Sequence, residues 1–150
     1  MALPFTAGQR LTAADLNAAT QQSAWTSYAT SWTAAGTAPA IGNGTLAARY
    51  SKVGRLVSVW LSWVKGSTTT LGTGTWSFTL PPYANANSGE RAGSAVANCA
   101  STTYYGSIFV AAGTVSPFFG TTGQFASSTT PGAWGTSDTL DLTFAYESTS

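Results

Sequence analysis

Few side chains in this sequence are of the types that carry out chemistry. Its 150 residues include no histidine, which excludes Ser-His and Cys-His nucleophile pairs and histidine-based metal sites. The one cysteine, Cys99, excludes thiolate zinc sites, and a lone cysteine among small residues is typical of a buried position. A glycosidase needs two carboxylates that face each other across a cleft. The five carboxylates are dispersed and indicate no such pair: Asp15, Glu90, Asp138, Asp141 and Glu147. We therefore predict no catalytic residue, no metal ligand and no cofactor, in a protein that is not an enzyme.

The protein surface must be poor in charge. Charged residues make up 7% of the chain, against about 25% in a typical globular domain. A soluble monomer normally carries mixed charges on its surface, whereas Thr, Ser, Ala and Gly take their place here. We therefore predict a homo-oligomer, with a neutral Thr/Ser surface on a monomer as the alternative. The net charge of +1 and the lack of a basic patch make nucleic acid an unexpected partner.

Three cations, Arg49, Lys52 and Arg55, fall close together around one predicted turn. The favoured interpretation is a solvated hairpin tip. The alternative is a small contact site for an anion or a carbohydrate.

Alternating apolar residues predict a mainly β fold. Residues 55–64 place four large apolar side chains on one face of an extended chain and a mixed set on the other. Comparable patterns between turn signals predict strands at residues 46–52, 55–64, 75–80, 94–100, 104–112, 115–119 and 139–146. The first three are expected to form an antiparallel meander, and Pro117 places its strand at a sheet edge. Together the strands predict an antiparallel β-sandwich or jelly-roll-like domain over residues 41–150.

Residues 1–40 are expected to form an N-terminal arm, a short α-helix at about 12–22 and a connector. Thr12 is a good N-cap, flanked by Leu11 and Leu16 at the positions of a hydrophobic staple. A helix this short is marginal alone, so it either anchors the protein to a partner or caps the open end of the β domain. The candidate anchor residues are the large apolar side chains of this region: Phe5, Leu11, Leu16, Trp25 and Trp32. We see no secretory signal and no membrane-spanning run, so we expect a soluble protein made in a cytoplasm, without membrane insertion.

Three pieces of the chain together carry a family likeness. The first is the segment PFTAGQRLTAADLN at residues 4–17, and the second combines Trp25, Trp32 and Gly36-Thr37 with IGNG at residues 41–44. The third runs from Arg49-Tyr50 through Gly54 to GTWSFTLP at residues 74–81. These pieces cover the first half of the chain, and a weaker likeness closes it at residues 135–147. The sequence resembles small structural proteins from the tailed phages of actinobacteria, and its opening segment resembles that of minor tail and fibre proteins there.

The resemblance implies a protein on the virion surface, attached by its arm and helix to other virion proteins, with the β domain projecting outward as a homotrimer. The first interpretation is a tail-fibre or minor tail component whose body is open to contact with host cell-surface carbohydrate. One alternative is a capsid decoration protein that stabilises the head, and another is a free carbohydrate-binding module or wall hydrolase. Core or subunit packing is the favoured interpretation of each aromatic candidate for sugar stacking: Tyr83, Tyr104, Tyr105 and Trp134.

Overall fold

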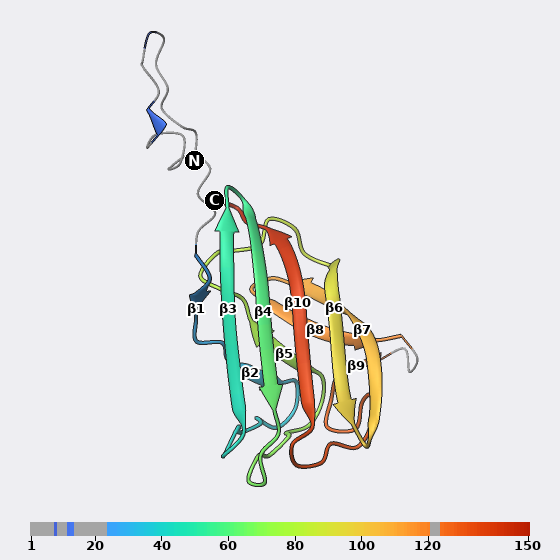
Figure 1. Cartoon of the computed structure of the whole chain (residues 1–150). Helices are drawn as coiled ribbons and strands as arrows, with labels where there is room; N and C mark the ends of the chain where they lie inside the picture. Colours follow the sequence, from blue (N-terminus) through green and yellow to red (C-terminus); the bar gives the residue numbers. More distant parts are fainter. Residues whose placement is uncertain (1–7, 9–11, 14–23, 121–123) are drawn as a thin grey trace.

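The computed structural model describes residue 8, residues 12–13, residues 24–120 and residues 124–150, and the protein that it shows is mainly β (Figure 1). Its strands are β1 (Thr26–Ser27), β2 (Trp32–Ala34), β3 (Thr45–Val53), β4 (Leu56–Val64), β5 (Trp76–Thr79), β6 (Glu90–Cys99), β7 (Thr102–Ala111), β8 (Thr114–Phe119), β9 (Gln124–Phe125) and β10 (Thr139–Glu147). The predicted helix at 12–22 lies outside the described residues apart from Thr12 and Ala13, as do Phe5, Leu11 and Leu16. In the part of the chain that is described, no helix is long and apolar enough to cross a membrane.

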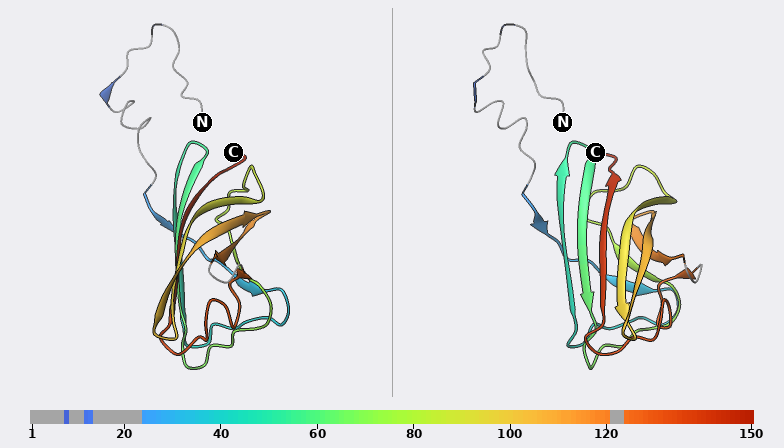
Figure 2. Two further views of the ribbon diagram at one scale, coloured as in Figure 1. Left: turned by 90° about the vertical axis from the view of Figure 1, so that its right-hand side faces the viewer. Right: turned by 45° about the vertical axis from the view of Figure 1, so that its right-hand side comes forward.

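The strands form one strongly curled sheet in which neighbouring strands run antiparallel, which confirms the predicted antiparallel β fold (Figure 2). The strand order is β1-β3-β4-β10-β6-β7-β8-β5-β2, and β9 pairs with β8. The two outermost strands, β1 and β2, are consecutive in the chain and are joined by residues 28–31. Tyr28 donates its N–H to the Ala48 carbonyl at 3.1 Å, and Thr79 donates to the Ser31 carbonyl at 3.1 Å. One short segment therefore bonds to both edges of the sheet, where unpaired backbone groups would otherwise invite other chains.

Strict alternation gives the sheet a core face and an outer face. Along β4 and β10, every second side chain is buried. The buried set is Val57, Val59, Leu61 and Trp63 on β4, and Leu140, Leu142, Phe144 and Tyr146 on β10. We call the opposite side of β3, β4, β10, β6 and β7 the outer face; Trp60, Ser62, Asp141 and Thr143 lie on it. Successive residues of a strand point to opposite faces, so the sequence pattern alone is enough to separate these two sets.

Four tryptophans fill the inside of the curl. Trp63 of β4, Trp32 of β2, Trp76 of β5 and Trp134 of the loop before β10 contact one another, with ring centroids 5.0–5.4 Å apart. Aromatic pairs of this kind add about 0.5–1.5 kcal/mol each beyond the area that they bury. The cluster joins β4, in the middle of the sheet, to β5 and β2 at its far edge. It therefore stabilises the curl itself.

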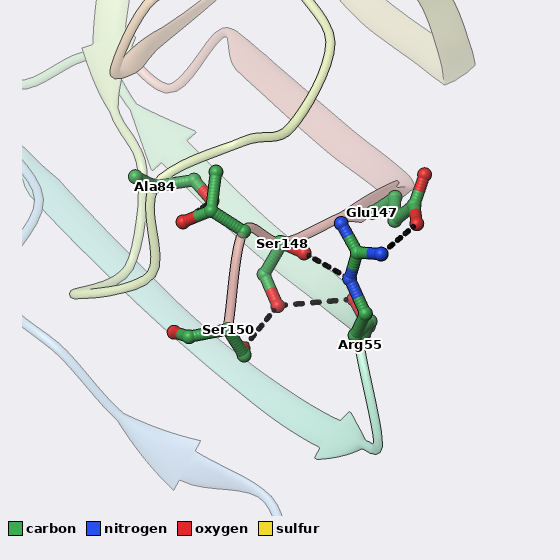
Figure 3. A network of polar contacts seen from close by, with 6 residues as sticks. Arg55, Ala84, Glu147, Ser148 and Ser150 are labelled. Atoms are coloured by element: carbon green, nitrogen blue, oxygen red, sulfur yellow. Dashed lines mark hydrogen bonds and ion pairs between the residues drawn. The ribbon is translucent and has the colours of Figure 1, made fainter. Parts of the chain in front are cut away.

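The C-terminal residues are bonded to the β3–β4 hairpin tip (Figure 3). Ser148, which is fully buried, donates its N–H to the Arg55 carbonyl at 2.7 Å, and its carbonyl accepts from Arg55 Nε at 2.8 Å. Arg55 also pairs with Glu147 at 3.0 Å, and Thr149 donates its N–H to the Ala84 carbonyl at 2.9 Å. Both groups of the ion pair are about half exposed, so the backbone bonds matter more than the charges.

Two details of the predicted sheet are wrong. The first three long strands do not form a meander, because β10 lies beside β4 where β5 was expected. The loop after β4 is hydrogen-bonded to the segment before β3. Asn43 Oδ1 accepts from the Thr68 N–H at 2.9 Å, and Ala40 and Thr70 exchange backbone hydrogen bonds at 2.9 Å. These bonds direct the chain away from β4 before β5 begins.

Pro117 does not mark a sheet edge, because β8 pairs with β7 on one side and with β5 and β9 on the other. The Pro117 carbonyl accepts from the Ala126 N–H, just beyond β9, at 2.8 Å. In an antiparallel strand the N–H and C=O of one residue point to the same side. Pro117 has no N–H, and this missing donor would point to the same side as its carbonyl, where β8 changes partner from β5 to β9. No backbone hydrogen bond between β8 and β7 is therefore lost.

Candidate functional site

The described carboxylates serve structural roles or lie apart. Glu147 pairs with Arg55, and Asp138 accepts from the N–H groups of Gly135 at 2.6 Å and Ala100 at 3.4 Å. Asp141 lies on the outer face between Ser62 and Val96. Among the residues with described positions, no group of three or more His, Cys, Asp and Glu side chains could hold a metal ion.

Cys99 is a core residue. It is buried, and burial raises the pKa of its thiol, with a further increase from the negative charge of Asp138. A raised pKa keeps the thiol protonated and weakly nucleophilic. The chemistry of this residue is therefore that of a small apolar side chain.

The three neighbouring cations do not form a common site. Arg49 lies on the outer face, with its guanidinium 4.7 Å from the Trp60 ring and 5.3 Å from the Trp25 ring. Lys52 lies 5.0 Å from the Tyr83 ring and donates to the Gly54 carbonyl at 2.6 Å. Arg55 is bonded to the C-terminal residues. Alternation places Arg49 and Lys52 on opposite faces of β3, so the anion site weighed from the sequence does not assemble.

The structure separates the four aromatic candidates. Trp134 is only 8% exposed and belongs to the tryptophan cluster, where its Nε1–H bonds to the Ser127 carbonyl at 2.9 Å. Tyr83 is half-buried against Tyr50, with ring centroids 5.5 Å apart, and Tyr104 packs against the core. Tyr105 is 74% exposed and projects from the outer face. Tyr105 alone of the four is free to stack on a ligand.

A shallow hollow lies beside Tyr105, and we call it the outer groove. Its volume is about 330 Å³, at the small end of ligand sites. Its lining residues come from β6, β7 and β8 and the residue after β8: Arg91, Tyr105, Gly106, Ser107, Phe118 and Gly120. Arg91 lies over the Phe118 ring at 4.4 Å and donates from Nη1 to Ser107 Oγ at 2.7 Å. The groove therefore combines an exposed aromatic ring, a fixed guanidinium and a hydroxyl.

Arg91 reaches the outer groove because of a β-bulge. Arg91 pairs with Phe109 and Ser94 pairs with Ser107, so β6 contains one residue more than β7 between these points. Ala95 is buried on the core face, and strict alternation along β6 would place Arg91, four residues earlier, on the same face. The extra residue reverses the alternation and puts Arg91 on the outer face, as bulges often do at functional sites. The strand predicted from the sequence begins at residue 94, whereas β6 begins at Glu90, so Arg91 was missed. The nearby Gly93 was the available signal, because a glycine inside a strand often marks a bulge.

A second feature of the outer face is the fixed root of the N-terminal arm. Trp25 immediately precedes β1 and packs against Arg49, whose other side meets Trp60. Trp25, Val53 and Leu56 are 49%, 50% and 54% exposed, which is unusual for large apolar side chains. We call these three residues the root patch. Of the predicted anchor residues, Trp25 is therefore on the surface, whereas Trp32 is in the core.

The root patch and the outer groove lie on different strands of the sheet (Figure 1). The root patch belongs to β3, β4 and the residue before β1, whereas the groove is lined by β6, β7 and β8, with β10 between the two sets. The strand register places Ser107 of the groove in the same row across the sheet as Arg49. The two features are therefore separated across the strands and not along them.

Comparison of the chain with protein-family models, curated proteins and solved structures gives no match.

Proposed function

We propose that the chain is a structural protein of a tailed-phage virion, held by its N-terminal arm and carrying its β domain on the virion surface. The observation that supports this best is the fixed root of the arm. Trp25 packs against Arg49 of β3, which in turn packs against Trp60 of β4, and these contacts link the arm to the sheet. A rigid junction of this kind transmits attachment of the arm to the whole domain.

The exposed surface supports an assembled state. The outer face carries Ser58, Ser62, Thr143 and Ala145 on its two central strands, and the root patch adds large apolar side chains. Interfaces are depleted in charge at their centres and enriched in aromatic residues. We propose a homotrimer in which the root patch is covered by other copies or by the virion protein that receives the arm, and in which the curled sheet forms a jelly-roll-like sandwich.

Within the virion we propose a tail-fibre or minor tail location. A capsid decoration protein would use the same arm and the same neutral surface, and it remains the alternative outcome of a location experiment. A free carbohydrate-binding module would require no arm attachment, so a protein absent from particles would favour it.

Deletion of residues 1–22 tests the role of the arm. The truncated chain keeps β1 and the segment that bonds to both sheet edges, so we expect it to fold. It should fail to join virions in a complementation assay with a phage that lacks the gene.

The variants Leu11→Asp and Leu16→Asp should weaken incorporation while leaving the melting temperature nearly unchanged. Tyr105→Ala, at an exposed position on β7, serves as the matched control and should incorporate normally. Normal incorporation of the truncated chain would show that the arm is not the anchor.

A further inference from the structure

We propose that the outer groove binds an acidic saccharide, one that carries a carboxylate on a pyranose ring. The apolar face of the sugar would stack on Tyr105, and the carboxylate would bind Arg91. This inference adds a ligand class to the proposed virion role. The binding itself requires only the folded β domain, so it can fail or succeed independently of that role.

The aromatic part of the site is Tyr105. Tyr105 is 74% exposed, so little of its ring surface is buried by the rest of the chain, whereas large aromatic side chains normally gain stability through burial. It lies on the long strand β7, in register with Val96 of β6 and three residues before the buried Ile108. A flat, exposed and well-positioned ring can stack on the C–H face of a sugar, and its hydroxyl can bond to the sugar's hydroxyl groups.

The charge of the site comes from Arg91. Within the described residues, the one ion pair joins Arg55 to Glu147, and Arg91 is paired with no carboxylate. Its bond to Ser107 uses one of the five N–H donors of a guanidinium. Phe118 supports the guanidinium plane from below, at 4.4 Å. A planar, pre-positioned guanidinium binds a carboxylate through two parallel hydrogen bonds, and this favours an acidic sugar over a neutral one.

The shape of the site fits a sugar better than a peptide side chain. The groove is shallow, and small residues separate the Tyr105 ring from the Arg91–Phe118 pair: Gly106 and Ser107. Gly106 keeps β8 close to β7, since a Cβ there would lie 2.4 Å from the Phe118 carbonyl oxygen. The stacking ring and the charged group are thus held on two sides of a hollow of about 330 Å³, with a hydroxyl between them.

The test is titration of the purified full-length chain with oligogalacturonides, followed by NMR chemical-shift changes. Matched neutral oligosaccharides, sodium acetate and inorganic phosphate serve as comparison ligands. We expect the acidic oligosaccharide to bind more tightly than the neutral one and to shift the amides of Arg91, Tyr105 and Ser107. Acetate and phosphate should bind far more weakly, because neither can stack on Tyr105.

Variants separate the two parts of the site. Tyr105→Ala, which removes the stacking ring, and Arg91→Gln, which removes the charge-assisted contact, should each weaken binding of the acidic oligosaccharide about tenfold or more. Lys65→Gln removes the same charge at a position outside the groove and should change affinity little. Thermal melts of each variant show whether the fold is intact.

Three results would overturn the proposal. One is the absence of shifts in the groove with every acidic oligosaccharide in the millimolar range. Another is equal affinity for acidic and neutral sugars together with no effect of Arg91→Gln. The third is equal binding of acetate or phosphate, which would mark the groove as a simple anion site. None of these results bears on incorporation into virions, so failure of the saccharide site and failure of the virion role are distinguishable.

Discussion

At the scale of single residues, three arginines of the β domain show how neighbours decide what one side-chain type does. Arg49 lies between two tryptophan rings and fixes the root of the arm. Arg55 bonds to backbone at the C-terminus, where it holds Ser148. Arg91 has an aromatic support and one hydroxyl partner, which leaves donors for a ligand. The first two therefore have structural roles, and only Arg91 is suited to recognition.

Tyr28 gives a prediction about pH at this scale. Burial raises its pKa from 10.0 to about 12, an effect partly opposed by its hydrogen bond with Thr30. The unfolded chain therefore loses this proton near pH 10, while the folded protein retains it up to about pH 12. Because the folded state binds more protons across that interval, stability is fully present below pH 10 and falls as the pH rises toward 12.

The measurement is the urea midpoint at pH 8, 10 and 11. We expect a decline above pH 10 in the natural chain and a smaller decline in Tyr28→Phe, which has no proton to lose. Part of the decline should remain, because burial also raises the pKa of Tyr146. An identical decline in the variant and the natural chain would contradict the role given to Tyr28.

At the scale of elements, the β-bulge in β6 is what distinguishes the structure from the pattern in the sequence. The long alternating strands, such as β4 and β10, could be predicted because alternation and burial agree along their length. The burial of Trp63 and the place of Asp141 on the outer face follow from the same rule. Arg91 could not be placed in this way, because one extra residue reverses the rule at the site of interest.

Gly93 makes the bulge possible, and its substitution is a test of it. A Cβ at Gly93 would lie 2.2 Å from the Thr143 carbonyl oxygen, and the residue has a φ of +154°. We expect Gly93→Ala to destabilise the protein by about 2 kcal/mol or more, through steric overlap with β10 and an altered bulge. The readouts are the free energy of unfolding and the NMR shifts of Arg91 and Ser107.

Gly113→Ala is the matched control. Gly113 also has a positive φ, +75°, but a Cβ there would meet no atom within 4 Å. Only backbone strain of about 1 kcal/mol is expected at this position. If the two substitutions had equal effects, close packing of the bulge against β10 would not be what holds Arg91 in place.

At the scale of the whole molecule, the order of the strands could not be predicted from local patterns. The segment containing β1 and β2 was expected to be a connector, yet it bonds to both edges of the sheet. The strands of this segment are too short to show an alternation of apolar and polar residues. Their positions are determined by β3 and β5, which lie far away in the chain. The tryptophan cluster likewise depends on four distant positions that meet only in the curled sheet. Tertiary packing, which a local pattern does not contain, decides these features.

The surfaces proposed for attachment and for recognition lie on different strands of one sheet. The root patch belongs to β3, β4 and the residue before β1, whereas the outer groove belongs to β6, β7 and β8, with β10 between them. A domain attached through one side of the sheet can leave the other side open to the surroundings. The neutral composition fits a surface that packs against copies of itself.

The proposed virion role is tested most directly by the location of the protein on purified particles of a phage that carries its gene, by cryo-electron microscopy with an antibody label on the β domain. We predict label at the tail tip, in threefold density whose arm-bearing ends face the tail. Label over the head would instead establish the capsid decoration alternative and contradict the tail location. Particles that carry no label at all would contradict the virion role as a whole.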